Sequence, residues 1–147
     1  MYKYSHKEFI TALEDKTLPE EMFTHEGHLR AAWIYLCEYE PQQATKKCCE
    51  AIKAYADSLG ATDKFNLTIS IALMKIISNR LITKDLKDSS AAVGQSEGYD
   101  WENFKLHNKD FFENALAILF RYYDKEVLFS DRAKREFIQP TLAFNSQ

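Results

Sequence analysis

Apolar residues recur every three to four positions along most of this chain, which is the spacing of one face of an α-helix. The pattern is strongest over 63–82, "DKFNLTISIALMKIISNRLI", where Thr68, Lys75 and Asn79 leave only a narrow polar strip. The alternation within "ISIAL" also suits a β-strand, but an apolar pattern of about twenty residues favours a helix. We therefore predict that 63–82 is a helix and the most buried element of the fold.

Capping and helix-breaking residues divide the rest of the chain into further helices. Ser5 and Glu8 form an S-x-x-E capping box, and Thr24 stands directly before a second periodic run. Pro41 separates that run from the next one, and Gly60 is suited to end the third helix. The predicted helices are 5–14, 24–39, 42–59, 63–82, 101–107, 109–123 and 131–138.

The same pattern predicts the domain organisation. Thr62 and Ser130 are the expected caps of the fourth and the last helix. The stretch 84–98 loses large apolar residues and gains Ser, Gly and charge, which indicates a flexible connection that is too short to separate two domains. We therefore predict that 1–147 is one all-α domain, a bundle of six to seven helices in which short connections make helices two to four run up, down and up.

The helix predicted at 109–123 places apolar residues, among them Leu116, on one face. Its aromatic residues continue this face, and such a stripe is more often part of a core than of a cofactor site. The stripe consists of Phe111, Phe112, Phe120, Tyr122 and Tyr123.

Composition and charge narrow the classes of partner. Four glycines and three prolines leave little for a turn-rich β protein, and 46% hydrophobic residues argue against disorder. The net charge is −3 and basic residues do not cluster, so the electrostatic footprint of nucleic-acid binding is missing. Neither a secretory leader nor an apolar stretch of ~18 residues is recognisable, so we expect a soluble, cytoplasmic protein without a membrane partner.

The cysteines agree with a reducing compartment. They are three in number, and the adjacent Cys48 and Cys49 are poorly placed to bridge each other. A vicinal pair can bind a soft metal, but we expect both side chains to be small buried hydrophobic groups on a helix.

Two histidines open the second predicted helix in "FTHEGHLRAAWIYL", residues 23–36. Counted at about 100° per residue, His25 and His28 flank the centre of the apolar face, so both are expected to point inward. "HEGH" is not the zinc-protease motif H-E-x-x-H, whose histidines are four apart. Histidines three apart can share a metal, but zinc needs at least a third protein ligand.

The up-down-up order brings a further group to these histidines. It places the N-termini of helices two and four at one end of the bundle, so the side chains of His25, His28 and Asn66 are expected within about 10 Å of one another. Two helix N-termini also offer unpaired N–H groups and positive dipole ends. A small anionic molecule is therefore as suitable a ligand here as a metal ion.

The motif at 23–36 also carries a resemblance. The chain resembles small uncharacterised bacterial helical proteins with the pattern F-x-H-x-x-H-L-x-x-A-W-x-Y-L, followed further along by G-x-x-x-K-[YF]-H-x-T-I. Here the second segment is "GATDKFNLTI". The resemblance implies that the two segments meet in space, but the third histidine of the pattern is Asn66 in this chain, which counts against a metal.

These observations predict a small-molecule- or ion-binding helical bundle with a polar pocket at the shared end of helices two and four. The pocket is expected to be lined by His25, His28, Trp33 and Asn66. No hydrolase or phosphate-loop motif and no particular cofactor is indicated; for catalysis, a neutral imidazole near a helix N-terminus would be the natural general base. The alternative is a non-catalytic protein-interaction module whose histidines are structural. His6 and His107 are expected to be solvated.

Overall fold

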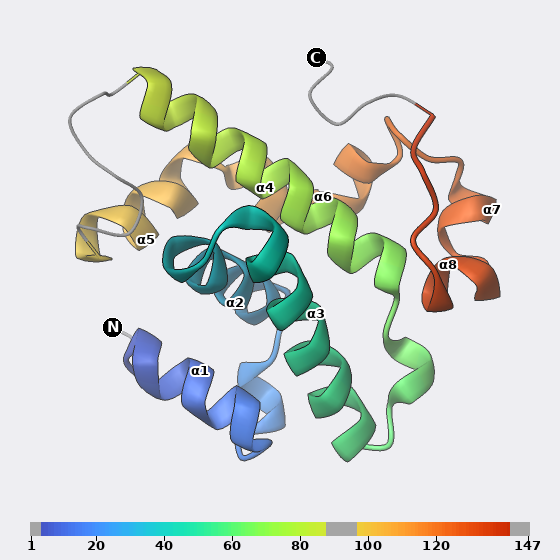
Figure 1. Ribbon diagram of the computed structural model, residues 1–147, viewed down its shortest axis with the longest axis horizontal. Coiled ribbons are helices and arrows are strands. Elements are labelled where there is room, and N and C mark those ends of the chain that lie inside the picture. The colour runs from blue at the N-terminus through green and yellow to red at the C-terminus, as the bar shows by residue number, and fades with distance from the viewer. Residues whose placement is uncertain (1–3, 88–96, 142–147) are drawn as a thin grey trace. The chain divides into compact units, whose positions relative to one another are not determined.

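The structure, a computed structural model, describes the backbone of residues 4–87 and 97–141 and the side chains of 4–81 and 101–141. Within these ranges the chain forms eight α-helices and two short 3-10 helices and contains no β-strand, which confirms the all-α prediction (Figure 1). In the same ranges, no helix has the uninterrupted apolar length needed to cross a membrane. The elements in chain order are α1 (His6–Asp15), η1 (Glu20–Met22), α2 (His25–Glu38), α3 (Pro41–Ser58), η2 (Thr62–Lys64), α4 (Leu67–Lys87), α5 (Glu97–His107), α6 (Lys109–Leu119), α7 (Lys125–Leu128) and α8 (Asp131–Arg135).

The chain divides into two compact units, Met1–Phe65 and Asn66–Gln147. The first unit contains α1 to α3, and the second contains α4 to α8. Two predictions involve both units: that the chain is a single domain, and that helices two to four run up, down and up. Both stay predictions.

The flexible connection predicted at 84–98 falls largely on 88–96, which lie outside the described residues. Its two ends differ from the prediction, because 84–87 belong to α4 and 97–98 belong to α5. α4 therefore ends later, and α5 begins earlier, than the loss of apolar residues indicated.

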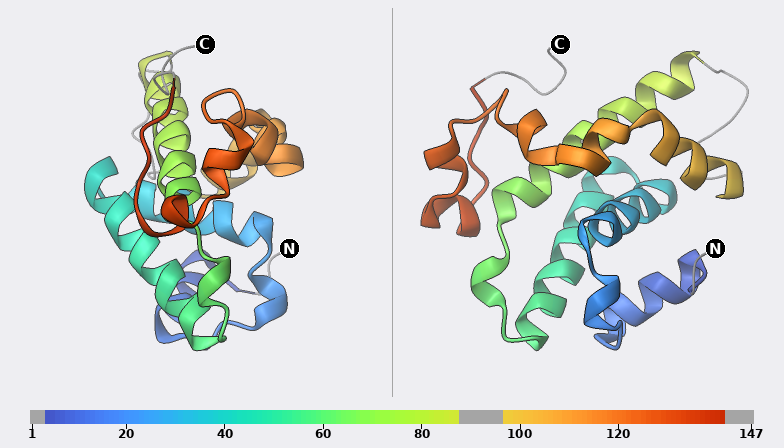
Figure 2. Two further views of the ribbon diagram at one scale, coloured as in Figure 1. Left: turned by 90° about the vertical axis from the view of Figure 1, so that its right-hand side faces the viewer. Right: turned by 180° about the vertical axis from the view of Figure 1, so that it is seen from behind.

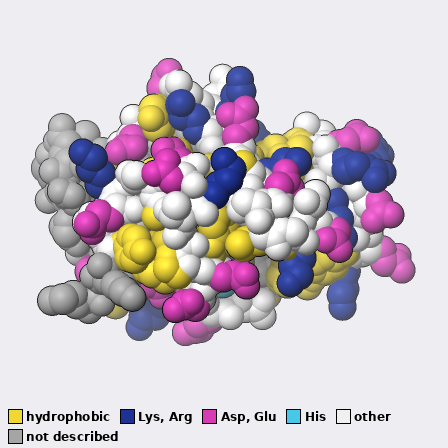
Figure 3. Space-filling model, turned by 90° about the horizontal axis from the view of Figure 1, so that it is seen from below, with side chains coloured by type: hydrophobic (Ala, Val, Ile, Leu, Met, Phe, Trp, Pro, Cys, Tyr) yellow, Lys and Arg dark blue, Asp and Glu magenta, His cyan; other side chains and the backbone are white. Residues whose placement is uncertain are grey.

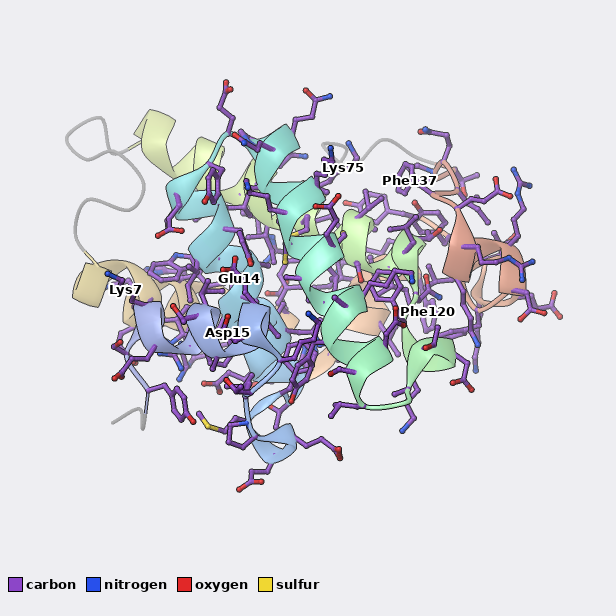
Figure 4. The ribbon with its side chains drawn as sticks, turned by 60° about the horizontal axis from the view of Figure 1, so that its bottom comes forward. Lys7, Glu14, Asp15, Lys75, Phe120 and Phe137 are labelled. Carbon is purple, nitrogen blue, oxygen red and sulfur yellow. The ribbon has the colours of Figure 1, made fainter. Side chains whose placement is uncertain are left out.

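In the first unit, α1, α2 and α3 pack against one another (Figure 1). α1 begins at the predicted capping box: the Glu8 N–H donates to the Ser5 hydroxyl at 3.0 Å, and the Ser5 N–H donates to Glu8 Oε1 at 2.9 Å. Near the C-terminal end of α1, the Tyr35 hydroxyl of α2 donates to Glu14 Oε2 at 2.6 Å (Figure 4). α1 is therefore capped at its start and fastened to α2 near its end.

α2 is the most buried helix of the described chain. Thr24 caps it as predicted, since the Gly27 N–H donates to the Thr24 hydroxyl at 3.2 Å. Every residue from 29 to 36 is buried, whereas α4 has an exposed Lys75 and many half-buried positions. The prediction that helix four is the most buried is therefore wrong. A wide apolar arc leads to burial only where other elements cover it, and the small alanines of α2 let neighbours approach closely.

α3 has the ends that its sequence predicts. Pro41 occupies the first turn, where its missing N–H costs no helical hydrogen bond. Gly60 follows the last turn with a φ of 72°, a left-handed conformation that glycine adopts without a steric penalty. The chain can therefore reverse there.

The start of α4 differs from the prediction. Thr62 begins η2 instead of capping α4, and the chain is extended at the buried Phe65. Asn66 is the residue that caps α4, because its Oδ1 accepts a hydrogen bond from the Ile69 N–H at 2.9 Å. Burial of Phe65 thus delays the helix to the next residue with a capping side chain.

In the second unit, α4 packs against α6 and α8, and α5 packs against α6 (Figure 2). Ser130 caps α8 as predicted, accepting a hydrogen bond from the Ala133 N–H at 3.1 Å. The helix predicted at 109–123 is shorter, since α6 ends at Leu119, and it is interrupted at Asn114, whose φ of −161° and ψ of 77° are not helical. The buried residues on the two sides of Asn114, Phe111, Ala115 and Ile118, nevertheless keep helical spacing.

The segment after α8 is bound to α4 and is not the helical turn that was predicted there. The buried Thr68 hydroxyl donates to the Glu136 carbonyl at 2.7 Å and accepts from the Ile138 N–H at 3.1 Å. The Lys75 amino group lies 5.9 Å from the centre of the Phe137 ring, and the two residues are neighbours in Figure 4. One α4 face therefore holds residues 136–138.

Candidate functional site

The two histidines at the start of α2 have different environments. His25 is exposed, whereas His28 is half-buried. The prediction that both rings face the core is therefore wrong for His25. The segment before α2 covers the side of the first turn that carries Gly27 and His28, and the first helical residue remains at the surface.

His28 belongs to an aromatic cluster with Phe23 and Tyr55. Its ring centroid lies 4.4 Å from that of Phe23, with an interplanar angle of 37°. Phe23 in turn makes an edge contact with Tyr55 at 5.0 Å, and the Tyr55 hydroxyl donates to the Leu18 carbonyl at 2.6 Å. The cluster therefore joins α2, α3 and the segment that connects α1 to α2.

Burial lowers the pKa of His28 from 6.5 to about 4, and the nearby His25 contributes in the same direction. Desolvation and a neighbouring positive charge both disfavour an imidazolium. His28 is therefore neutral at neutral pH. One of its two ring nitrogens then carries a lone pair and can accept a hydrogen bond or bind a ligand. Because its pKa is so low, however, the ring is a weak base.

Gly27, between the two histidines, is required by close packing. A Cβ atom at this position would lie 2.6 Å from the Met22 carbonyl oxygen, well inside van der Waals contact. The sequence motif shows a glycine in the first helical turn, which is unfavourable for a helix and indicates a packing role. The close approach itself depends on η1, which the sequence did not predict.

Trp33 is buried and lies in the core of the first unit. Its ring meets the ring of His6 edge-on, with centroids 5.1 Å apart. His6 Nδ1 accepts a hydrogen bond from the buried Arg30 Nε at 3.1 Å, so the prediction that His6 is solvated is wrong. The capping box starts α1 directly before His6 and thereby sets this ring against α2. His107, in contrast, is exposed as predicted.

Asn66 belongs to the second unit, and its side chain has partners there. Its Nδ2 donates to the Leu128 carbonyl at 2.9 Å, while its Oδ1 caps α4 through Ile69. Three of the predicted pocket residues thus lie in the first unit and one in the second. Convergence of Asn66 with His25 and His28 stays a prediction.

Metal-ligating side chains do not assemble in the part of the chain that the structure describes, where no group of three or more His, Cys, Asp or Glu is placed to hold an ion. Cys48 and Cys49 are buried, as predicted. Burial raises the pKa of Cys49 to about 12 and that of Cys48 well above its ordinary value. Both thiols therefore stay protonated, and a protonated thiol is a poor metal ligand.

An exposed apolar cluster lies in the second unit, formed by Leu116, Phe120 and Phe129; we call it the Phe120 patch. The relative exposures are 38%, 39% and 43% in that order, and the two rings meet edge-on with centroids 6.2 Å apart. Phe120 is labelled in Figure 4. The predictions that Leu116 shares the core-facing side of its helix and that Phe120 is core are wrong, because the buried face is centred on Phe111, Ala115 and Ile118. At about 100° per residue, Leu116 lies at the edge of that face and Phe120 lies opposite it.

Charges of both signs are interspersed on the face of the molecule in Figure 3, and hydrophobic side chains reach the surface between them. Mixed charge of this kind is usual for a protein surface. No family model, curated protein or solved structure matches this chain. The likeness of the histidine motif to small bacterial proteins stays a prediction.

The packing of Gly27 makes its replacement by alanine a test of the first unit. Helix propensity favours Gly27→Ala by about 1 kcal/mol, but overpacking against a backbone carbonyl typically costs about 1–3 kcal/mol. We expect a net loss in the free energy of unfolding, measured by urea denaturation with Trp33 fluorescence. Gly60→Ala is the comparison for glycine loss without overlap: no atom lies within 4 Å of its Cβ position, but its φ of 72° is strained for alanine and should by itself cost about 1–2 kcal/mol. A stabilised Gly27→Ala protein would show that the segment at Met22 can move away from residue 27 at little energetic cost.

The neutral state of His28 predicts a pH-dependent stability. Because its folded pKa of about 4 lies below the unfolded 6.5, the unfolded chain binds the proton first as the pH falls. The contribution of His28 to the free energy of unfolding is complete above pH 6.5. It is lost as the pH falls toward 4, by at most about 3 kcal/mol. Urea denaturation between pH 7.5 and 4 should show a smaller loss for His28→Gln than for the wild type. His107→Gln should follow the wild type; parallel wild-type and His28→Gln curves would contradict the assignment.

Proposed function

We propose that this chain is a non-catalytic protein-interaction module that binds its partner through the Phe120 patch. The observation that carries this proposal is the edge-to-face pair of Phe120 and Phe129, both more than a third exposed, with Leu116 beside them. Large apolar side chains that gather at a surface, instead of being scattered singly, are characteristic of binding sites.

The pair has the properties of an interface centre. Aromatic side chains bring much contact area with few rotatable bonds, and the contact between the two rings restricts them before a partner arrives. Little conformational entropy is then lost on binding. The exposed Arg121 and Asp124 follow Phe120 in sequence and are suited to the polar rim that surrounds such a centre.

The histidines support the same proposal, since their local contacts are those of structural residues. His28 is a neutral ring stacked on Phe23, and His6 is an acceptor for Arg30. Trp33 and Asn66, expected in a pocket, pack in the core and cap a helix. None of these contacts requires a small ligand.

The test is site-specific photo-crosslinking in the cell that makes the protein. With p-benzoylphenylalanine in place of Phe120, we expect one crosslinked partner that is missing when the crosslinker replaces Leu106, which is 58% exposed and serves as the control. With the purified partner, Phe129→Ala should raise Kd by at least about tenfold, because central aromatic residues dominate interface energies. Leu106→Ala should leave Kd unchanged, and both variants should keep wild-type stability. An unaltered Kd for Phe129→Ala would refute binding through this patch.

A small-molecule- or ion-binding site at His25 and His28 is the second candidate. It is favoured by the exposure of His25, which lies in the same helical turn as a neutral His28, since imidazole is a common ligand of metal ions. A ligand that binds only the native state raises the melting temperature by mass action. A thermal-shift panel of phosphate, small carboxylates and Zn²⁺ should then raise the wild-type Tm but not that of His25→Ala. Equal shifts in the two proteins, or none in the wild type, would rule this candidate out.

A further inference from the structure

We propose that the partner of the Phe120 patch is a second copy of this chain. The two copies associate about a two-fold axis at the patch, with Arg121 of each copy facing Asp124 of the other. This inference rests on the proposed function, because it needs the patch to be a binding surface. Three properties of the second unit favour a copy of itself as the partner: its exposed rings, the charges beside them and its net charge.

The rings of the patch are suited to contact with the same rings of a second copy. A two-fold interface brings one surface of both copies together, so that surface must be complementary to itself. An aromatic ring carries partial negative charge on its faces and partial positive charge at its edge. Phe120 and Phe129 are inclined at 76° and both exposed, so the patch presents rings in two crossed orientations. A half-turn can then set a ring edge of one copy on a ring face of the other.

The charges beside the patch are also complementary to themselves. The chain between the two rings carries four exposed charged side chains of alternating sign: Arg121, Asp124, Lys125 and Glu126. Across a two-fold axis, opposite charges of one rim can pair with each other, whereas a rim of one sign would repel its copy. Within the described residues, neither Arg121 nor Asp124 is in an ion pair. Each is therefore available to the other residue of a second copy.

Net charge distinguishes the unit that carries the patch from the other unit. Residues 66–147 contain eleven basic and eleven acidic side chains, so the second unit is neutral overall. Residues 1–65 contain eight basic and eleven acidic side chains and account for the whole net charge of −3. Contact between two second units therefore opposes no net charge, whereas contact between two first units would bring like charges together.

The size of the patch determines how strong the association can be. The rings of Phe120 and Phe129 are 39% and 43% exposed, and such a ring buries about 150–250 Å² when it is fully covered. The two rings therefore contribute roughly 120–200 Å² per copy, well below the ~800 Å² of a stable interface. We expect a weak and reversible dimer with a Kd of about 10–100 µM.

Sedimentation equilibrium of the purified protein tests the proposal. Between about 5 and 500 µM, a range that spans the expected Kd, the wild type should change from monomer to dimer. Phe129→Ala should raise the dimer Kd by at least about tenfold, because central aromatic residues dominate interface energies. Leu106→Ala, which alters an exposed apolar residue outside the patch, should leave the dimer Kd unchanged. A wild type that stays monomeric throughout, or a Phe129→Ala protein that dimerises like the wild type, would overturn the proposal.

Charge reversal tests the two-fold pairing itself. Arg121→Glu sets two like-charged pairs across the axis, and so does Asp124→Lys, so each variant alone should dimerise at least about tenfold more weakly. An equimolar mixture of the two should recover the wild-type Kd, because every residue 121 then faces a residue 124 of opposite charge. Variants that dimerise like the wild type when alone, or a mixture as weak as its components, would refute the pairing.

Photo-crosslinking separates failure of this inference from failure of the proposed function. With p-benzoylphenylalanine in place of Phe120, a second copy gives a product of twice the chain mass, joined to the partner's patch. A monomeric wild type that crosslinks from residue 120 to a different protein would overturn the second copy but keep the interaction module. A monomer that gives no product, or one joined only within its own chain, would overturn both.

Discussion

The approach of the Met22 carbonyl to Gly27 determines how the first unit closes over the start of α2. A Cβ atom at residue 27 would lie only 2.6 Å from the Met22 carbonyl oxygen, so the segment before α2 reaches this position because residue 27 has no side chain. That segment sets Phe23 on the ring of His28 and brings the Leu18 carbonyl to the Tyr55 hydroxyl. The burial of one histidine and the exposure of the other follow from a single backbone contact.

In both units, side chains donate hydrogen bonds to carbonyl groups that lie at or beyond the ends of helices. In the first unit, Tyr55 donates to the Leu18 carbonyl. In the second, Tyr123 donates to the Ile138 carbonyl at 2.6 Å, and Asn66 donates to that of Leu128. A buried carbonyl without a donor would cost about 1–3 kcal/mol, so each such side chain decides where a loop can run. Polar residues in this protein thereby determine loop paths as much as apolar residues determine the core.

Local interactions explain which parts of the fold were predictable. The capping residues Ser5, Thr24 and Ser130 were identified correctly because each bonds an N–H three residues away. Thr62 and Asn66 are both suitable caps, and the choice between them depends on burial of Phe65 and on Leu128, which is distant in sequence. A pattern of residue types contains no information about the contact between Asn66 and Leu128.

The candidate sites were less predictable for the same reason. A helical wheel assigned both His25 and His28 to the inner face, but only the path of η1 distinguishes them. The predicted stripe was centred near Leu116, whereas the buried face is centred on Phe111, Ala115 and Ile118, so Phe120 lies on the outer side. The role of His6 depends on Arg30, 24 positions away. Sequence thus identified the chemically interesting histidine motif, while its surroundings required coordinates.

The bonds of Thr68 impose an order on folding during synthesis. The Tyr55 hydroxyl and the Leu18 carbonyl are 37 positions apart, so they can meet as soon as the first unit has left the ribosome. The Thr68 hydroxyl is bonded to the N–H of Ile138, 70 positions further on, and this bond cannot form until that residue has been made. Closing so long a loop is also entropically costly and slow. From the synthesis of α4 until that of Ile138, α4 must therefore exist without the segment that finally covers Thr68, and its apolar face is available to chaperones during that interval.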